Sequence, residues 1–286
     1  MRVVRLRLRL LVLFFSATLA PVPASAQERA YFVTYDHYLE ERGNLEIAIA
    51  ATTGVPKGEV PTYTAPWLEL EYGLTGWWTA EFYLEGVAAH GQGSAFTGWR
   101  WENRFRPLKT ERAVNPVIYV EYESINEASR IHKEIVGSGA LSDESIDELS
   151  KEHVHELEAK LILSSAVRGW NLSENFIVEK NLSADEGFEF GYSVGVSRPL
   201  GGLASGTSCR LCRENFVAGV EAYGGLGESK NFTFADTRHF LAPVVAWHLS
   251  DRMMIKASAG FGLTDASERY LFRFGWAYEM PIGAGR

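Results

Sequence analysis

Residues 67–86, WLELEYGLTGWWTAEFYLEG, limit the possible fold more than any other part of this chain. On both sides of a Gly-Leu-Thr-Gly segment, glutamates alternate with leucine, tyrosine or phenylalanine. A period of two around a short glycine-bounded turn predicts an antiparallel hairpin with one acidic and one apolar face. In a soluble sheet the apolar face would form the core. In an outer-membrane barrel it meets lipid, the acidic face lines a polar bore and tryptophan marks the interface.

The first 26 residues have the three parts of a secretory signal peptide. Four arginines lie within residues 2–9, the apolar run Leu10–Ala20 follows, and Ala24-Ser25-Ala26 matches an A-x-A cleavage site. The apolar run is too short to span a bilayer as a helix. We therefore expect export, with a mature chain that begins near Gln27.

The charge of the expected mature chain excludes several classes of partner. Removal of residues 1–26 takes away four arginines and no acid, so the formal net charge falls from −8 to −12. This argues against nucleic acid and anionic lipid surfaces as partners. Because no later run of 18 or more apolar residues exists, a membrane-embedded chain would have to be a closed barrel.

From residue 43 onward, twelve segments have strand character, most with alternating polarity. They are residues 43–53, 64–73, 77–87, 95–106, 114–124, 153–166, 170–179, 187–198, 213–223, 236–249, 251–263 and 267–280. An even count, and lengths near the roughly 9–11 residues of a tilted membrane strand, favour an outer-membrane barrel. An aromatic girdle at the predicted periplasmic ends agrees with this, formed by Trp77, Trp78, Trp170, Trp247, Trp276 and Tyr278. A soluble β-sandwich is the alternative.

We therefore predict an all-β fold, a monomeric transmembrane antiparallel up-and-down β-barrel of about 12 strands in the bacterial outer membrane. The expected organisation is a signal peptide (1–26), a periplasmic lead-in (27–42), the barrel (43–280) and a C-terminal tail (281–286). Residues 125–150 interrupt the strand period and predict a long extracellular loop. Within it we expect helices over residues 127–136 and 142–152, the second capped by Ser142 or Asp143.

Two residues conflict with a regular barrel pattern. Glu174 falls on the lipid-facing side of its segment, which predicts a bulge or a register shift there. Pro243 weakens the assignment of residues 236–249 as a strand, because proline cannot donate to the ladder.

The candidate functional residues are the polar side chains that alternation places in the bore. They are Glu46, Glu69, Glu71, Glu81, Glu85, Arg100, Glu102, Arg104, Glu121, Glu123, Glu156, Glu158, Lys160, Glu189, Glu221, Lys256 and Arg273. An acidic bore would favour cations and basic or neutral solutes. In a structural interpretation, the acids pair with the interleaved bases and fill much of a narrow barrel. Both interpretations stay open at this point.

Cys209 and Cys212, in SCRLCRE, are expected to form a small disulfide in an exported chain. A thioredoxin-like context for a redox C-x-x-C is not visible, and Arg213 stands where haem attachment requires histidine. Two further ligands for zinc are also not evident nearby.

Three patterns could indicate an enzyme or a metal site, and each has a simpler explanation. The pairs Glu121/Glu123 and Glu156/Glu158 could perturb one another's ionisation, but no nucleophile or cleft signal accompanies them. His248-Leu249-Ser250 resembles the His and Ser of outer-membrane phospholipase barrels, although Ser250 falls in a turn. His132, His153 and His155 lack ligand spacing on one element. We expect no enzyme activity, no cofactor and no metal.

At residues 67–86, and again at VAWHLSDRMMIKASAGFGLTD (residues 245–265), the chain resembles the MetA-pathway of phenol degradation family of outer-membrane barrels. The likeness covers roughly residues 43–280. It implies a passive channel or transporter for small solutes, surrounded by outer-membrane lipid. The alternatives are a structural barrel with a closed bore and a lipid-acting outer-membrane enzyme.

Overall fold

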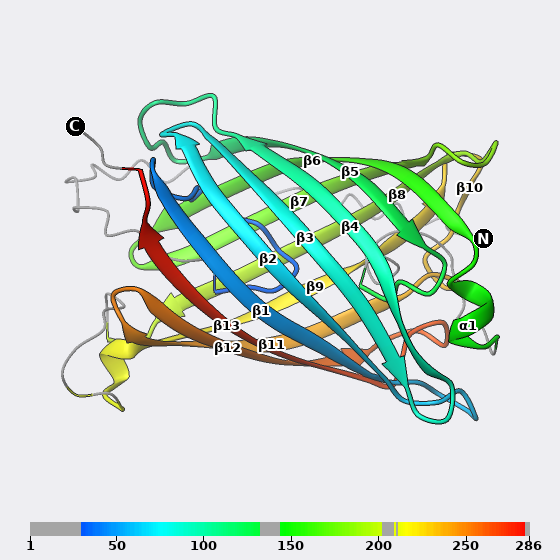
Figure 1. Ribbon diagram of the computed structural model, residues 1–286. Helices are drawn as coiled ribbons and strands as arrows, with labels where there is room; N and C mark the ends of the chain where they lie inside the picture. Colours follow the sequence, from blue (N-terminus) through cyan, green and yellow to red (C-terminus); the bar gives the residue numbers. More distant parts are fainter. Residues whose placement is uncertain (1–29, 132–143, 202–208, 210, 284–286) are drawn as a thin grey trace, which may run out of the picture.

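The computed structural model describes residues 30–131, 144–201, 209 and 211–283. Its strands close into one antiparallel barrel of twelve strands, with β13 paired to β1 (Figure 1). The strands are β1 (Asn44–Val55), β2 (Tyr63–Thr75), β3 (Trp78–Ala89), β4 (Gly93–Phe105), β5 (Asn115–Asn126), β6 (His153–Val167), β7 (Trp170–Asn181), β8 (Phe188–Pro199), β9 (Phe216–Glu228), β11 (His239–Ser250), β12 (Met253–Gly262) and β13 (Tyr270–Pro281). A two-residue strand, β10 (Asn231–Phe232), pairs antiparallel with the end of β9. Each predicted segment overlaps one barrel strand, so the predicted fold class is confirmed and the sandwich alternative is wrong.

The polarity of the barrel is the reverse of that of a soluble sheet. On β3 the side chains of Glu81, Tyr83 and Glu85 are buried, whereas Phe82 and Leu84 are 37% and 38% exposed. The same alternation places exposed apolar side chains around the outside, including Ile49, Trp101, Ile118, Leu161, Phe176 and Phe274. Because an isolated buried carboxylate is costly, burying acids while exposing phenylalanine suits a chain whose outer surroundings are apolar.

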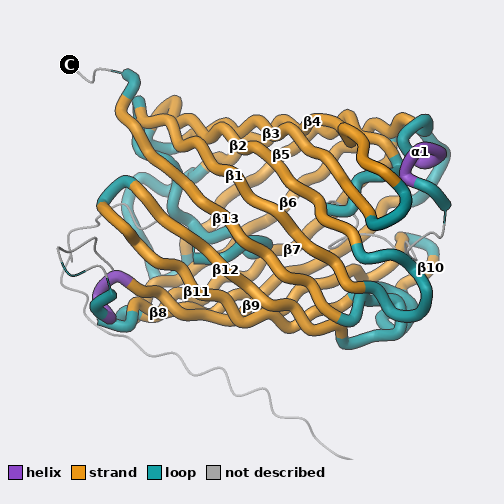
Figure 2. The backbone as a smooth tube through the Cα atoms, turned by 60° about the horizontal axis from the view of Figure 1, so that its bottom comes forward, coloured by secondary structure: helices purple, strands orange, loops and turns teal. Residues whose placement is uncertain are grey.

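The two ends of the barrel differ. Trp78 and Trp170 begin β3 and β7, and Trp247 and Trp276 lie near the ends of β11 and β13, so all four are at one end, here named the tryptophan end. The other end, named the loop end, carries β10 and the short helix α1 (Ile146–Leu149) (Figure 2). The 3-10 turn η2 (Arg213–Asn215) lies at the tryptophan end (Figure 2). The shared position of these tryptophans agrees with the predicted girdle.

Short turns at the tryptophan end fix the pairing of neighbouring strands. Arg168 and Gly169 join β6 to β7, and both have positive φ, at 54° and 80°. A two-residue hairpin turn with positive φ at both positions matches the twist of the flanking strands.

No helix in the described ranges is long and apolar enough to cross a membrane.

The structure shows how the barrel accommodates the two irregular positions, Glu174 and Pro243. Glu174 lies opposite Leu163 and Val194 without a register shift at that point, so the predicted bulge is wrong. It faces outward near the tryptophan end, four residues after Trp170. Pro243 lies within β11, opposite Val220 of β9, and its carbonyl accepts a hydrogen bond from Ser258 Oγ at 3.0 Å.

Residues 30–42, here named the N-terminal arm, were expected outside the barrel as a periplasmic lead-in, and for these residues that prediction is wrong. The arm runs through the barrel interior as an irregular segment (Figures 1 and 2). Tyr31, Thr34 and His37 are at most 1% exposed. The partners of the arm come from β4, β6, β7, β9 and β12, and only the interior of a closed barrel is bounded by all of these strands.

The long insertion between β5 and β6 contains less helix than the sequence predicts. In its described part, the helix is α1, whose N-cap is Ser145 and not Ser142 or Asp143. Residues 127–131 form no helix, and residues 132–143 lie outside the described ranges. The predicted signal peptide also lies outside them, as do residues 284–286 of the predicted tail. Ile282 and Gly283 donate backbone hydrogen bonds to Gly43, which closes the β13–β1 seam.

Candidate functional site

The strand register places ten glutamates in one continuous row inside the barrel, here named the glutamate row. Each member lies directly opposite the next on the neighbouring strand, in the order Glu279, Glu46, Glu71, Glu81, Glu102, Glu121, Glu158, Glu179, Glu189 and Glu228. Because the strands are tilted, a row of opposed residues spirals along the axis of a barrel. This row begins near the end of β13 at the tryptophan end and reaches the last residue of β9 at the loop end. It therefore connects the two mouths.

The ionised groups beside the glutamate row are placed to offset its charge. Like charges directly opposite one another destabilise a sheet. Arg104 forms ion pairs with Glu71, Glu81 and Glu102, the last at 3.1 Å. On the other side of the row, Arg100 pairs with Glu121 at 3.1 Å and with Glu85. Lys160 pairs with Glu158 at 2.7 Å. Arg104 is 2% exposed, so this network lies away from water.

The acids still outnumber the bases. Twelve strand glutamates are buried, against three strand bases: Arg104, Lys160 and Arg273. Arg100 and Lys256 are half-buried. Within the described strands, the bore therefore carries an excess of carboxylates that extends from mouth to mouth.

The N-terminal arm crosses this charged interior. The backbone N–H groups of Phe32, Val33 and Thr34 all donate to the Glu221 carboxylate, at 3.1, 2.8 and 2.7 Å. The Tyr35 hydroxyl donates to Glu102 of the glutamate row at 2.8 Å. The Tyr35 ring also lies against Lys160, whose Nζ is 4.8 Å from the ring centroid. The arm thus fills the middle of the bore with aromatic side chains.

One arm residue completes an arrangement that resembles a hydrolase triad. His37 Nδ1 is 2.8 Å from Ser164 Oγ, and His37 Nε2 is 3.4 Å from a Glu111 oxygen. Ser173 donates a hydrogen bond to the same Ser164 oxygen at 2.9 Å. Ser164 and His37 are each 1% exposed, so a substrate has no path to the hydroxyl. The contact anchors the arm to β6. This contact was not predictable from the sequence, because residues 37 and 164 are far apart along the chain and meet only in the closed barrel.

The long insertion folds into the mouth at the loop end. Ala128, Ile146 and Leu149 pack against Tyr63, Ala65 and Val87, which face inward from β2 and β3. Ser129 donates a hydrogen bond to Glu85 at 3.2 Å. The described parts of this insertion therefore narrow the bore at the loop end, while the N-terminal arm occupies it from the tryptophan end.

A small cavity remains between the arm and the insertion. Its volume is about 70 Å³, and its lining includes Phe32 and Tyr35 of the arm and Ile131 of the insertion. Glu69, Glu121 and Lys160 line it from the wall. Since a buried water needs about 10–15 Å³ on this measure, the cavity has room for a few waters or one small ion with part of its hydration shell.

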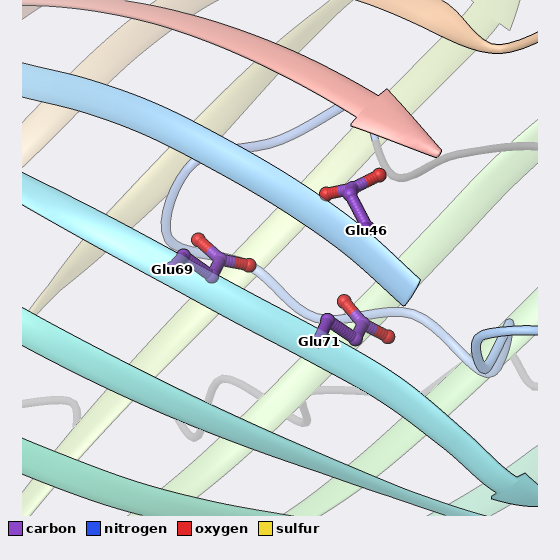
Figure 3. Close-up of side chains that lie close together, drawn as sticks. All are labelled: Glu46, Glu69 and Glu71. Carbon is purple, nitrogen blue, oxygen red and sulfur yellow. The ribbon is translucent and has the colours of Figure 1, made fainter. Parts of the chain in front are cut away.

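Within the described part of the chain, three groups of glutamates bring carboxylate oxygens within 4.8 Å of one another: Glu46/Glu69/Glu71, Glu121/Glu123/Glu158 and Glu123/Glu156/Glu179. Figure 3 shows the first group, in which Glu46 of β1 and Glu69 and Glu71 of β2 extend from adjacent strands into the barrel. Carboxylate oxygens suit hard cations such as Ca²⁺ and Mg²⁺. The arrangement can attract cations, and nothing in it requires a resident metal.

The structure places the predicted bore-lining residues as follows. Buried and facing inward are Glu46, Glu69, Glu71, Glu81, Glu85, Glu102, Arg104, Glu121, Glu123, Glu156, Glu158, Lys160, Glu221 and Arg273. Arg100, Glu189 and Lys256 are half-buried on the same face, where Glu189 lies opposite Glu179 and Lys256 donates to the Tyr31 carbonyl at 3.4 Å. The N-terminal arm, which contributes Tyr31, Phe32 and Tyr35 to the interior, was missed. Its three tyrosines within eight residues were the available signal.

The remaining sequence motifs do not form reactive sites. His248 is buried on the inner face, while Ser250 Oγ accepts a hydrogen bond from the backbone of Arg252 in the turn. His155 lies on the outer face with Nδ1 3.0 Å from the Tyr122 hydroxyl. His132 lies outside the described residues. Cys209 and Cys212 form the predicted disulfide at the tryptophan end.

Comparison with solved structures identifies the fold. The COG4313 outer membrane channel from Pseudomonas putida F1 superposes with a TM-score of 0.59 at 9% identity, covering 86% of this chain and 98% of that one. The NanC porin gives a TM-score of 0.51 at 9% identity, covering 82% of this chain and all of the porin. The chain has the fold of these channels. No protein-family model and no curated protein matches its sequence.

Proposed function

We propose that this protein is a monomeric passive channel of the bacterial outer membrane that admits small solutes and prefers cations. The glutamate row carries this proposal, because it offers carboxylates at every level between the two mouths. Rings of acidic side chains are the common basis of cation preference in pores. Adjacent weak sites along a path also let an ion leave as readily as it enters.

Three further features support a place in the outer membrane. The apolar side chains face outward, the tryptophans gather at one end, and a closed barrel has no unpaired edge to satisfy in lipid. The predicted signal peptide would supply export. Membership of the MetA-pathway of phenol degradation family remains a prediction from the sequence likeness.

A second candidate function is a structural barrel with a closed bore. The observation that favours it is the filling of the interior by the N-terminal arm and by the described part of the insertion, with a cavity of about 70 Å³ between them. A lipid-acting enzyme has no such support, since the described Ser–His contact is sealed from substrate.

Planar-bilayer recording separates the two candidates. The purified protein is reconstituted in a neutral lipid bilayer between unequal KCl concentrations. Discrete conductance steps, with a reversal potential of the sign expected for K⁺ preference, are the predicted result. Absence of conductance, with the arm present or deleted, would indicate a closed structural barrel. A reversal potential of the opposite sign would contradict the cation preference.

A further inference from the structure

Both described ends of the N-terminal arm lie near the tryptophan end. Its first described residue, Ala30, packs against Val217, Ala246 and Met254 near the tryptophan end. Its middle reaches deeper, where Val33 packs against residues of β9, β11 and β13. The arm then returns, and Arg42 bridges to Gly73 at the tryptophan end, just before β1 begins. A segment with this path can withdraw without being threaded through the barrel.

Side chains attach the arm to the wall, in contrast to the backbone ladders between the strands. Among the described residues, the hydrogen bonds from residues 31–38 to the wall each use a wall or arm side chain, as in the mutual pair between Tyr35 and Asn175 at 2.7 and 2.8 Å. Withdrawal of the arm would therefore leave the twelve-stranded ladder intact. With the predicted cleavage after Ala26, the arm would be joined covalently to the barrel at Gly43 alone.

We propose that the N-terminal arm is the gate of this barrel and that Glu221 is its latch. The docked arm closes the bore, and withdrawal through the tryptophan end opens it. This proposal rests on the proposed channel function, and the experiment below allows one to fail without the other.

Glu221 is suited to hold the arm because it gathers three consecutive backbone donors. The N–H groups of residues 32–34 converge on its carboxylate within 3.1 Å, and Glu221 is fully buried. Hydrogen bonds to an ionised acceptor are roughly twice as strong as neutral ones. The strand beside Glu221 leaves room for the arm: a Cβ at Gly195 of β8, which pairs with Glu221, would lie 2.8 Å from the Tyr31 ring and 3.1 Å from Thr34 Cγ2. The wall therefore provides the arm with a carboxylate that binds its backbone, at Glu221, and with space for its side chains, at Gly195.

The docked arm also competes with a solute for the glutamate row. The Tyr35 hydroxyl donates a hydrogen bond to Glu102, and two cations lie near its ring, with Lys160 Nζ 4.8 Å and Arg104 Cζ 5.3 Å from the ring centroid. When the arm withdraws, Tyr35 no longer fills the space beside the middle of the row. Closure and solute passage then use the same part of the bore and exclude one another.

A reversible cross-link tests the gate directly. Thr34→Cys and Gly195→Cys are combined in a Cys209→Ser/Cys212→Ser background, so that only the new pair can form a disulfide. A Cβ at position 195 would lie 3.1 Å from the present Thr34 Cγ2, close enough for a disulfide to form, but 2.8 Å from the Tyr31 ring, so Tyr31→Ala is added to both the cysteine pair and the background to make room. Conductance is recorded in the same bilayer after oxidation and again after addition of a reductant. The background protein, treated identically, is the control. We expect oxidation to abolish the conductance steps and reduction to restore them.

A second pair of variants keeps the test decisive if the cross-linked protein does not fold. Glu221→Ala should raise the open fraction by about tenfold, which corresponds to about 1.4 kcal/mol of lost docking free energy. The control is Glu228→Gln on the same strand, which removes an acid near the loop end, far from the arm. Loss of an acid alone would lower cation conductance. An increase in conductance in Glu221→Ala, and not in Glu228→Gln, would therefore indicate that the arm has been released.

The outcomes separate the two proposals. Conductance that persists in the oxidised, fully cross-linked protein overturns the gate and leaves the channel standing. An unchanged open fraction in Glu221→Ala overturns the latch. Absence of conductance in the wild type, in Glu221→Ala and in a variant lacking residues 27–41 overturns the channel, and the gate with it.

Discussion

Glu121 of β5 lies directly opposite Glu158 of β6 inside the barrel, and both carboxylates are buried. A like-charged opposed pair destabilises a sheet, and here eight further pairs continue the same row. Arg100 and Lys160 offset the charge of these two glutamates from the neighbouring rows. The row therefore lowers the stability of the fold. We attribute its presence to the function of the bore.

Arg104 should be the base on which the stability of the barrel depends most. It pairs with three glutamates on three adjacent strands. Arg104→Met removes the cation that they share, and breaking a buried ion pair from one side costs about 3–5 kcal/mol. The free energy of unfolding, measured in urea with lipid vesicles, should fall by about that amount. Arg112→Met, exposed in the loop before β5, is the control and should stay within about 0.5 kcal/mol. Equal losses for the two variants would contradict the role given to Arg104.

The outward face of β3 should not tolerate charge. Phe82→Arg places a cation in the lipid-facing band, where it costs about 2–4 kcal/mol near the midplane. We expect a reduced yield of folded barrel in lipid vesicles, measured by heat-modifiable gel migration. Glu71→Gln, which faces inward from β2, should fold in normal yield because Arg104 keeps two other partners. A normal yield for Phe82→Arg would show that this face does not meet lipid.

Docking of the N-terminal arm should weaken as the pH rises towards 8. Burial, followed by repulsion from Glu279 and Glu46, raises the pKa of Glu40 from 4.5 to about 8. The docked arm thus binds more protons than the withdrawn arm between these values, so docking loses stability as the pH rises through this window. Because His37 of the same arm acts in the opposite direction below pH 6.5, the open fraction should increase between about pH 6.5 and 8 and then level off.

Glu40→Gln should remove most of this increase. The effect of pH on docking through His37 is the opposite. Burial lowers the pKa of His37, so its contribution to docking is lost as the pH falls below its ordinary value of 6.5. A variant with His37 intact and Glu40 neutral should therefore open on acidification alone. An open fraction of Glu40→Gln that still rises between about pH 6.5 and 8 would contradict the assignment to Glu40.

The insertion between β5 and β6 should restrict entry from the loop end. Deletion of residues 127–149, with a short glycine-containing turn in their place, exposes the inward-facing apolar side chains of Tyr63, Ala65 and Val87 to the mouth. Conductance should increase while the barrel still folds. Leu149→Asp, which detaches the described helix without shortening the chain, should give a smaller increase. Unchanged conductance in a correctly folded deletion variant would remove the insertion from the permeation path.

The period of two was enough to locate twelve strands and to assign their inner faces, because burial in a barrel wall alternates residue by residue. Register was not predictable in this way. The sequence places Glu102, Glu121 and Glu158 on inner faces, but only the pairing of β4, β5 and β6 shows that they are direct neighbours. The two-residue strand β10 is too short for any period to appear.

The N-terminal arm escaped prediction for a physical reason. Its residues follow no period, since an irregular segment inside a barrel is contacted from all sides. Its site consists of Glu221, Asn175 and Ser164, which are far apart in the sequence and converge on closure of the barrel. Its aromatic content was visible, but composition alone does not separate a segment inside a bore from one outside it.

The ion preference of the bore, and its dependence on the glutamate row, test the central claim most directly. Glu189→Gln/Glu228→Gln neutralises one opposed pair of the row near the loop end, and Glu174→Gln neutralises an outward-facing acid as the control. Reversal potentials are measured in planar bilayers under a KCl gradient. We predict a cation-selective wild type, a reversal potential closer to zero for the double variant, and no change for Glu174→Gln. Equal reversal potentials for all three proteins, or an anion-selective wild type, would contradict the proposal that the glutamate row is the path through this barrel.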